Sequence, residues 1–411
     1  MKHINKNGID ILIKNSKNTP RTAVCFYFQV NKQEKIAGAN ALFAKLLLQG
    51  TKTKTAEQLA SELENNCIDV SIKSKQDYLK VSFLFLNEDF ELAMQYAKDI
   101  LLNSTFNDIE KEIHKIKGEI TADLDNPRVL ASDCFIKNLF TPHCYSNTCT
   151  KVLEEIDNIK KQDILEVFEQ FMNSKKVISL VGDFCDEEKI CDHIAQNFDF
   201  MKTCENASQI EDFTEFKCED KKSKIIKLPK ADLNQAQIFQ GWVVPNFRDE
   251  MYPKIALMNN ILGASGLSSR LFVELRDKQG LAYTVRSSYE TLTHSAIFSF
   301  YIATEPKNIK KSLDGFAIEL EKIANTPPSK EELIGGRENI LGRLEYFSQT
   351  NSQIASAEGY NFFMGLGLNY NDKFAQMINN TTQEDVSEAA KFILDRKSLI
   401  CTLAPQDFLN F

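Results

Sequence analysis

Two hydrophobic periods alternate along this chain. At 80–86, apolar and polar residues alternate one by one, which predicts a half-buried strand. The segment 87–101 then has apolar residues at the three- and four-residue spacing of an amphipathic helix. The same order of strand, short turn and helix returns at 297–320. This recurrence predicts that the chain contains one structural unit twice.

The positions of single residues support a duplication. Ser82 in the first copy corresponds to Ser299 in the second, and the closing strands at 176–183 and 398–405 align Val177 with Leu399. The separation between corresponding residues is therefore nearly constant over distant segments. Such agreement indicates two homologous halves.

Each half runs strand, helix, helix, strand, strand, several helices and a final strand. In the first half the strand at 22–30 precedes a helical pattern at 38–51 and a second helix, for which Thr55 and Gln58 form a predicted capping box. Hairpin-connected strands with helices gathered on one face are typical of an α+β sandwich. We therefore expect two homologous α/β sandwich domains, each with a mainly antiparallel sheet and helices on one face.

The predicted boundary lies in a charged, weakly periodic stretch. Residues 205–224 are poor in large apolar side chains and predict a linker. The N-terminal domain is then 1–204 and the C-terminal domain 225–411. Two domains also suit the length of 411 residues, which exceeds a single ordinary core.

Composition narrows the function. The chain is 43% hydrophobic and 26% charged with a net charge of −8, which argues against a nucleic-acid partner. It contains no apolar run long enough to cross a membrane and begins without a signal-peptide pattern, so we expect no membrane partner and a cytoplasmic location, or a periplasmic one if an export signal has been removed. The ten cysteines form no C-x-x-C pair and are expected to be free, buried thiols.

The segment 270–285 reads as a helix that stops at a glycine and continues as a strand. Its pattern predicts an Arg270–Glu274 pair on the polar helix face and a left-handed stop at Gly280. The turn at this glycine can bring Arg276 near Tyr283. Two structural roles stand beside a functional one: a cation at the helix C-terminus, and a core tyrosine with its hydroxyl at the surface.

Segment 263–285, with 7–15, 112–127 and 381–394, resembles the pitrilysin/insulinase metallopeptidases, which are relatives of the mitochondrial processing peptidase. This resemblance covers most of the chain. It implies a half-clamshell of two similar α+β domains, in agreement with the duplication.

The resemblance also implies a zinc site that this chain has lost. Peptide-cleaving members carry H-x-x-E-H on the first long helix, and the matching positions here include Ala41, Ala44 and Lys45. Alanine has no lone pair, and a lysine ammonium repels a metal cation. None of the five histidines forms an i,i+4 pair. We expect no metal or other cofactor in this chain, and no hydrolysis of peptides by it alone.

By the same resemblance, Glu119 occupies the position of the downstream zinc ligand and Glu112 that of its supporting glutamate. They stand two helical turns apart and are expected to face the same way. One interpretation is a solvated helix face. The other is that the Lys45 cation takes over the electrostatic role of the metal and pairs with Glu119 in a partly buried cleft.

Arg276 and Tyr283 match the family's residues that hold the substrate backbone and stabilise charge on the attacked carbonyl. In two-chain relatives one subunit supplies the metal helix and the other this pair. The leading hypothesis is therefore a non-catalytic, substrate-binding subunit of a heterodimeric zinc peptidase acting on extended peptides, with zinc in the partner. Alternatives are a structural scaffold that pairs with itself as a homodimer, and a stand-alone peptide-binding protein.

Overall fold

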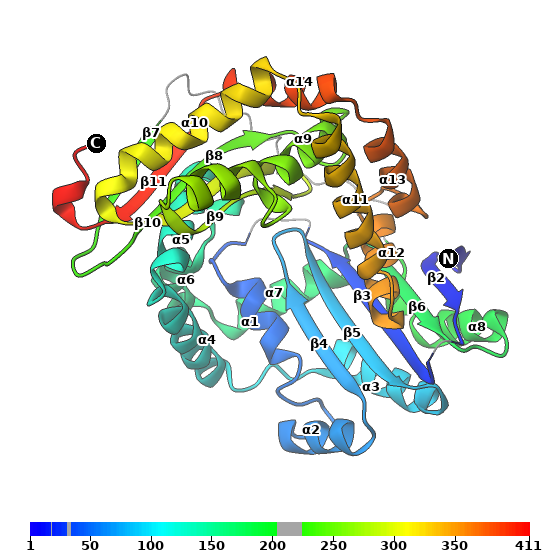
Figure 1. Ribbon diagram of the computed structural model, residues 1–411. Coiled ribbons are helices and arrows are strands. Elements are labelled where there is room, and N and C mark those ends of the chain that lie inside the picture. The colour runs from blue at the N-terminus through cyan, green and yellow to red at the C-terminus, as the bar shows by residue number, and fades with distance from the viewer. Residues whose placement is uncertain (18, 31–33, 204–223) are drawn as a thin grey trace. The chain divides into compact units, whose positions relative to one another are not determined.

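The computed structural model describes residues 1–17, 19–30, 34–203 and 224–411 (Figure 1). Its contacts divide the chain into two compact units. The N-terminal unit contains Met1–Glu119, Lys151–Phe213 and Glu345–Tyr370, and the C-terminal unit contains Ile120–Thr150, Thr214–Leu344 and Asn371–Phe411.

The N-terminal unit has a six-stranded sheet in the order β1-β2-β6-β3-β5-β4 (Figure 1). Every neighbouring pair is antiparallel except β2 and β6, which are parallel. The strands are β1 (Lys2–Lys6), β2 (Ile9–Asn15), β3 (Arg21–Gln29), β4 (Asp69–Ser74), β5 (Tyr78–Leu86) and β6 (Lys176–Gly182).

The C-terminal unit has a five-stranded sheet in the order β7-β11-β8-β10-β9, in which β7 and β11 are the parallel pair. The order and directions repeat those of β2-β6-β3-β5-β4, as the duplication requires. The strands are β7 (Lys224–Pro229), β8 (Ala236–Val244), β9 (Ala282–Thr291), β10 (Ala296–Thr304) and β11 (Leu399–Ala404).

The ladders correct one detail of the predicted duplication. Cys25 pairs with Ser82 and Ser179, and Gly241 pairs with Ser299 and Leu399. If Ser82 corresponds to Ser299, then Leu399 corresponds to Ser179. The alignment of Leu399 with Val177 was wrong by two positions, which is one full strand repeat and so leaves every side chain on its correct face.

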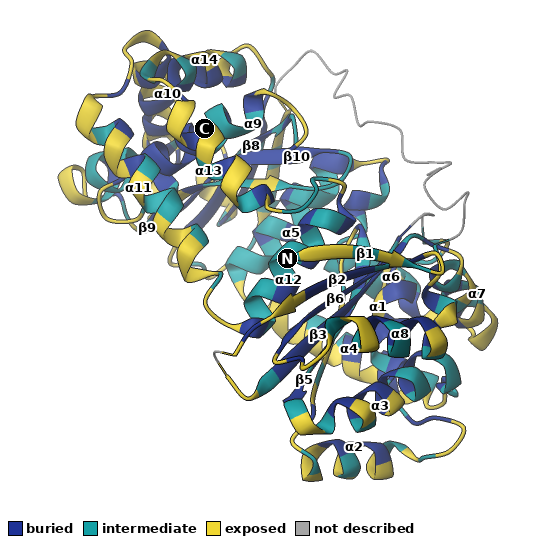
Figure 2. Cartoon of the chain, turned by 90° about the vertical axis from the view of Figure 1, so that its right-hand side faces the viewer, coloured by how far each residue is buried: buried dark blue, intermediate teal, exposed yellow. Residues whose placement is uncertain are grey.

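Each sheet also has a helix on its second face. In β3, Phe26 stacks on Phe198 with ring centroids 5.6 Å apart, and the next residue, Tyr27, stacks on Phe363 of α12 at 5.4 Å. Neighbouring residues of a strand point to opposite faces, so both faces of this sheet are covered. The central strands are accordingly buried along most of their length (Figure 2).

The C-terminal unit repeats this arrangement with α5. Phe239 of β8 stacks on Phe135 of α5 at 5.6 Å, while Phe300 of β10 stacks on Phe316 of α10 at 4.8 Å. The two-domain α+β fold is confirmed, and the second-face helices add to it. Because α5 belongs to the first half of the sequence and α12 to the second, each unit contains a helix from the other half.

This helix exchange explains why the compact units differ from the predicted division into 1–204 and 225–411. Each unit is assembled from three segments, whereas the division follows sequence order. The predicted linker, 205–224, lies outside the described residues except for Lys224, which begins β7.

The helices connect the strands within the chain order. In the part of the chain that the structure describes, none is long and apolar enough to cross a membrane. The bounds are α1 (Ala39–Leu46), α2 (Ala56–Asn65), α3 (Phe90–Asn103), α4 (Ile109–Leu124), α5 (Pro127–Phe140), α6 (Cys149–Glu155), α7 (Lys161–Met172), α8 (Glu187–Asn197), α9 (Met251–Asn259), α10 (Ile309–Asn325), α11 (Lys330–Tyr346), α12 (Asn351–Phe363), α13 (Tyr370–Asn380) and α14 (Gln383–Leu394).

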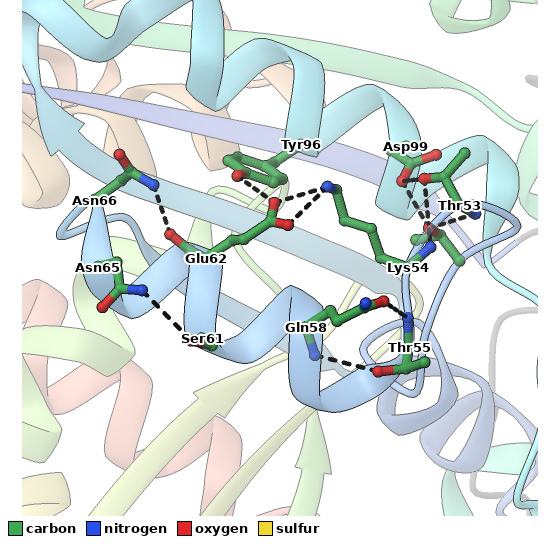
Figure 3. A network of polar contacts seen from close by, with 11 residues as sticks. Thr53, Lys54, Thr55, Gln58, Ser61, Glu62, Asn65, Asn66, Tyr96 and Asp99 are labelled. Atoms are coloured by element: carbon green, nitrogen blue, oxygen red, sulfur yellow. Dashed lines mark hydrogen bonds and ion pairs between the residues drawn. The ribbon is translucent and has the colours of Figure 1, made fainter.

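The start of α2 forms as its sequence predicts. The Thr55 hydroxyl accepts from the backbone N–H of Gln58, and the Gln58 side chain accepts from the Thr55 N–H, which confirms the capping box (Figure 3). Beside it, the Glu62 carboxylate accepts from Lys54 Nζ at 2.9 Å and from the Tyr96 hydroxyl at 2.7 Å. Burial, followed by the bond to this carboxylate, raises the pKa of Tyr96 to about 12. These contacts attach α2 to α3.

The eight described cysteines are free, as expected, but their burial differs from the prediction. Cys25, Cys191 and Cys401 are buried, whereas Cys67 and Cys185 are exposed. Cys25 and Cys401 lie in strands and Cys191 lies in α8, whereas Cys67 and Cys185 lie in connecting segments at the surface.

Close packing of α12 on its sheet leads to a stability prediction. A Cβ on Gly359 would lie 2.7 Å from Cε2 of Tyr27 and 2.9 Å from Cβ of Ser179. Gly359→Ala is therefore expected to lower the free energy of unfolding by about 1–3 kcal/mol, measured by chemical denaturation. Gly335→Ala is the matched control, because nothing lies within 4 Å of its Cβ and α11 should gain about 0.5–1 kcal/mol. Equal effects of the two substitutions would contradict the close approach.

Candidate functional site

The residues at the zinc-motif positions lie on α1. This helix begins after Gly38, whose φ of 95° is accessible chiefly to glycine, and packs through buried Phe43, which stacks on Phe171 at 5.4 Å. Ala41 and Lys45 stand four residues apart and so share a face, which is solvent-accessible, while Ala44 is buried. α1 therefore presents positions 41 and 45 on one accessible face, where neither side chain is a metal ligand.

Lys45 pairs with Glu119 of α4. Its ammonium donates to both carboxylate oxygens, each at 2.7 Å. The pairing proposed from the sequence is thereby confirmed. The surroundings are more open than expected, since the side chains are 38% and 57% exposed. Solvent screens such a pair, so it contributes only about 0–1 kcal/mol to stability.

Glu112 has a different environment from Glu119, although two helical turns separate them. It is buried, and its carboxylate accepts from Lys115 Nζ at 2.5 Å. Along α4 the buried residues are Glu112, Ile113 and Ile116, whereas Glu119 is exposed. The two glutamates thus bind separate lysines and do not form a shared carboxylate pair.

These residues do not fit a zinc ion. Methyl groups stand at 41 and 44, and the cation at position 45 occupies both oxygens of the one remaining carboxylate. Among the described residues, no three histidine, cysteine, aspartate or glutamate side chains come together in a way that could hold a metal.

Removing the Lys45 cation should have little effect on folding. Lys45→Met is expected to change the free energy of unfolding by less than about 1 kcal/mol, because the Glu119 carboxylate then returns to water. Glu112→Leu removes the buried carboxylate and leaves the half-exposed Lys115 ammonium to solvent. Its free energy of unfolding tests whether this carboxylate contributes more than its contact with Lys115. A loss above about 2 kcal/mol for Lys45→Met would show that the pair is a structural element of the fold.

Arg276 and Tyr283 lie on either side of a helix-to-strand turn in the C-terminal unit. The helix at 270–271 continues as a π-helix over Phe272–Lys278, and Gly280 has the predicted left-handed backbone with φ of 60°. In the β9–β10 ladder, Ala303 pairs with Thr284 and Thr304 with Ala282. Tyr283 is thus the extra residue of a β-bulge, which turns its side chain outward and leaves it 76% exposed.

The bulge and the π-helix together fix Arg276. Its Nη1 donates to the Tyr283 carbonyl at 2.7 Å. Its guanidinium lies over the Phe272 ring at 4.4 Å and over the Tyr283 ring at 4.5 Å. In the described part of the chain this guanidinium makes no ion pair, and the Tyr283 hydroxyl makes no hydrogen bond. Further N–H donors and a phenol therefore remain available to a ligand.

The predicted Arg270–Glu274 pair is wrong. Arg270 instead binds Glu332 of α11 with two hydrogen bonds, of 2.6 and 2.9 Å, and Glu274 binds Lys278. A bidentate guanidinium–carboxylate contact in a half-buried setting is stronger than a single exposed contact along one helix. The same arginine lowers the pKa of Glu332.

Sequence reasoning assigned Phe272 only to the apolar helix face and missed its contact with Arg276. An aromatic residue four positions before a cation was the available signal, since such positions are neighbours on a helix. Neither the π-helix nor the bulge at Tyr283 has a signal in the sequence pattern.

The geometry defines a class of protein: a duplicated two-domain α+β fold with an ordered Arg276–Tyr283 pair and with no metal ligand at positions 41, 44 and 45. A family model described as insulinase (peptidase family M16) matches residues 11–132, and one described as peptidase M16 inactive domain matches 158–340. The chain belongs to the M16 peptidase family, as a member without the H-x-x-E-H motif at positions 41–45.

Individual relatives are distant but cover nearly the whole chain. A Helicobacter pylori protein described as non-peptidase homolog YmxG is 24% identical and covers 86% of this chain and 81% of its own length. A Bacillus subtilis protein described as uncharacterized zinc protease YmxG is 21% identical and covers 97% of each. A crystal structure of a peptidase M16 inactive domain from Pseudomonas fluorescens has a TM-score of 0.85 at 22% identity and covers 98% of each chain. The similarity to this crystal structure supports the two-domain fold described above.

Proposed function

We propose that this chain is the non-catalytic, substrate-binding subunit of a heterodimeric zinc peptidase. The observation that carries the proposal is the combination of a metal helix without ligands and an Arg276–Tyr283 pair that is still held in place. Arg276 is fixed by two rings and a carbonyl, and Tyr283 is presented on a bulge. A fixed, permanently charged donor is suited to stabilising an oxyanion.

In this proposal the partner is a homologue with an intact H-x-x-E-H motif, and zinc belongs to that partner. The pair supplied by this chain binds the substrate backbone and the developing negative charge opposite the partner's metal. Substrates are extended or unfolded peptides, and the assembly works in the cytoplasm.

A structural role is the second candidate. One relative is described as a non-peptidase homolog, and a scaffold has no need of zinc ligands. In that case the chain assembles with itself or with another protein, and Arg276 and Tyr283 have no substrate.

Reconstitution separates the two functions. Mixing this chain with an H-x-x-E-H homologue from the same cell should give chelator-sensitive cleavage of an unfolded peptide that neither chain cleaves alone. Co-purification should recover the two chains in equal amounts. A chain that purifies only with itself, and adds no cleavage to any such homologue, would exclude the heterodimer and favour the scaffold.

A further inference from the structure

A second cationic group lies on the C-terminal unit, around Tyr301 of β10. The guanidinium of Arg128, in the first turn of α5, lies over this ring at 4.7 Å, and that of Arg286, on β9, lies at 5.8 Å. Arg286 is also the cross-strand partner of Tyr301. The ring is fixed in turn, because its buried hydroxyl donates to Gln237 Oε1 at 2.7 Å. The fixed Tyr301 ring therefore contacts the guanidinium groups of both arginines.

Neither arginine is neutralised. In the described part of the chain, Arg128 and Arg286 make no hydrogen bond or ion pair through their guanidinium groups. The nearest acids in the sequence, Asp125 before α5 and Glu290 on the same face of β9, are likewise not bonded to them. Two cations over one ring, neither with a counterion among the described residues, are an unusual local excess in a protein of net charge −8.

The helix position of Arg128 increases this excess. The first turn of α5 carries no acidic residue, although the positive end of a helix dipole favours one there. Arg128 places a cation at that end instead. A bound anion at this place would interact favourably with both guanidiniums and with the helix terminus.

The position of β9 in its sheet indicates which kind of ligand would carry the anion. β9 is the last strand of its sheet and pairs only with β10 among the described residues, so its second edge has no partner strand there. An extended peptide can add to such an edge by backbone hydrogen bonds, with alternate side chains directed to one face. Arg286 is exposed on this same strand, three residues after Tyr283.

We propose that Arg128 and Arg286, positioned by Tyr301, form a specificity site that binds the carboxylate of an acidic side chain in a peptide extended along β9. The inference rests on the proposed peptide-binding function and adds the substrate class to it. A guanidinium fork matches a carboxylate in geometry as well as in charge, which an ammonium does not.

Binding of three labelled peptides tests the site. They are identical in length and sequence except for one central residue, which is Glu, Gln or Lys, and their dissociation constants from the full chain are measured by fluorescence anisotropy. The Glu peptide should bind about tenfold more tightly than the Gln peptide, and the Lys peptide more weakly still. Arg286→Gln and Arg128→Gln should each remove most of this preference while the Gln peptide binds as before.

Matched variants give the controls. Arg343→Gln removes an equal charge from an exposed position on α11 of the same unit and should leave the preference unchanged. Arg286→Glu should reverse the preference toward the Lys peptide, a result that loss of folding cannot produce. Equal binding of all three peptides to the unmodified chain would overturn the specificity site and leave the proposed function standing. Failure to bind any of them would overturn both.

Discussion

Replacing Arg276 by alanine should lower kcat of the reconstituted heterodimer by about 10²–10³-fold, with a much smaller change in KM. The guanidinium is fixed by Phe272, the Tyr283 ring and the Tyr283 carbonyl before any substrate arrives. Loss of one preorganised donor to an oxyanion typically costs this much, because the donor acts on charge that develops in the transition state. Steady-state kinetics on an unfolded peptide, with the zinc-bearing partner held constant, measures the effect.

Tyr283→Phe separates the hydroxyl from the ring. The phenylalanine ring can still lie against Arg276, and the backbone carbonyl at 283 still accepts its N–H, so the positioning of the arginine survives. We expect a drop of about tenfold in kcat for the lost donor. Arg343→Ala, at an exposed position on α11, is the control for charge and should be neutral. Full turnover in both Arg276→Ala and Tyr283→Phe would show that the assigned role is wrong.

Placing histidines at positions 41 and 45 of α1 should create a zinc site where the present side chains do not fit one. In Ala41→His/Lys45→His, two imidazoles share one helix face, and Glu119 is released from its lysine. Three protein ligands with an open fourth position are a common zinc arrangement. Titration with zinc should give one site per molecule, with a dissociation constant below about 1 µM, a free energy of about −8 kcal/mol.

Two further variants show whether Glu119 completes that site. Adding Glu119→Gln to the double variant should weaken zinc binding at least about tenfold, because an amide oxygen is a poorer ligand than a carboxylate. Ala41→His alone, which retains the Lys45 cation, should bind no zinc at this affinity. Tight binding by the single variant, or none by the double variant, would contradict the placement of the degenerate site.

Local features could be predicted from the sequence because they depend on contacts between residues that are close in the chain. The capping box at Thr55 and the left-handed stop at Gly280 depend on residues within a few positions, and both formed as predicted. The pairing of Lys45 with Glu119 reaches further along the chain, and it was predicted from opposite charges at two positions that the family resemblance places together. Arg270 shows the limit of such predictions. It binds Glu332, which only the folded chain brings close, and not Glu274, which is nearest in the sequence.

By itself the sequence determined the duplication, the two-domain α+β class, the absence of ligands at positions 41, 44 and 45, and the presence of Arg276 and Tyr283 around a glycine turn. Periodicity and lone pairs are properties of residue types, and the resemblance to the peptidase family located positions 41, 44, 45, 276 and 283, so these conclusions needed no coordinates. Tertiary structure alone decided that α5 and α12 pack on the sheets of the opposite halves, that a bulge exposes Tyr283, and that Arg128 and Arg286 meet at Tyr301. Each of these joins residues far apart in the chain, or changes strand register by one residue, and neither effect leaves a hydrophobic pattern to read.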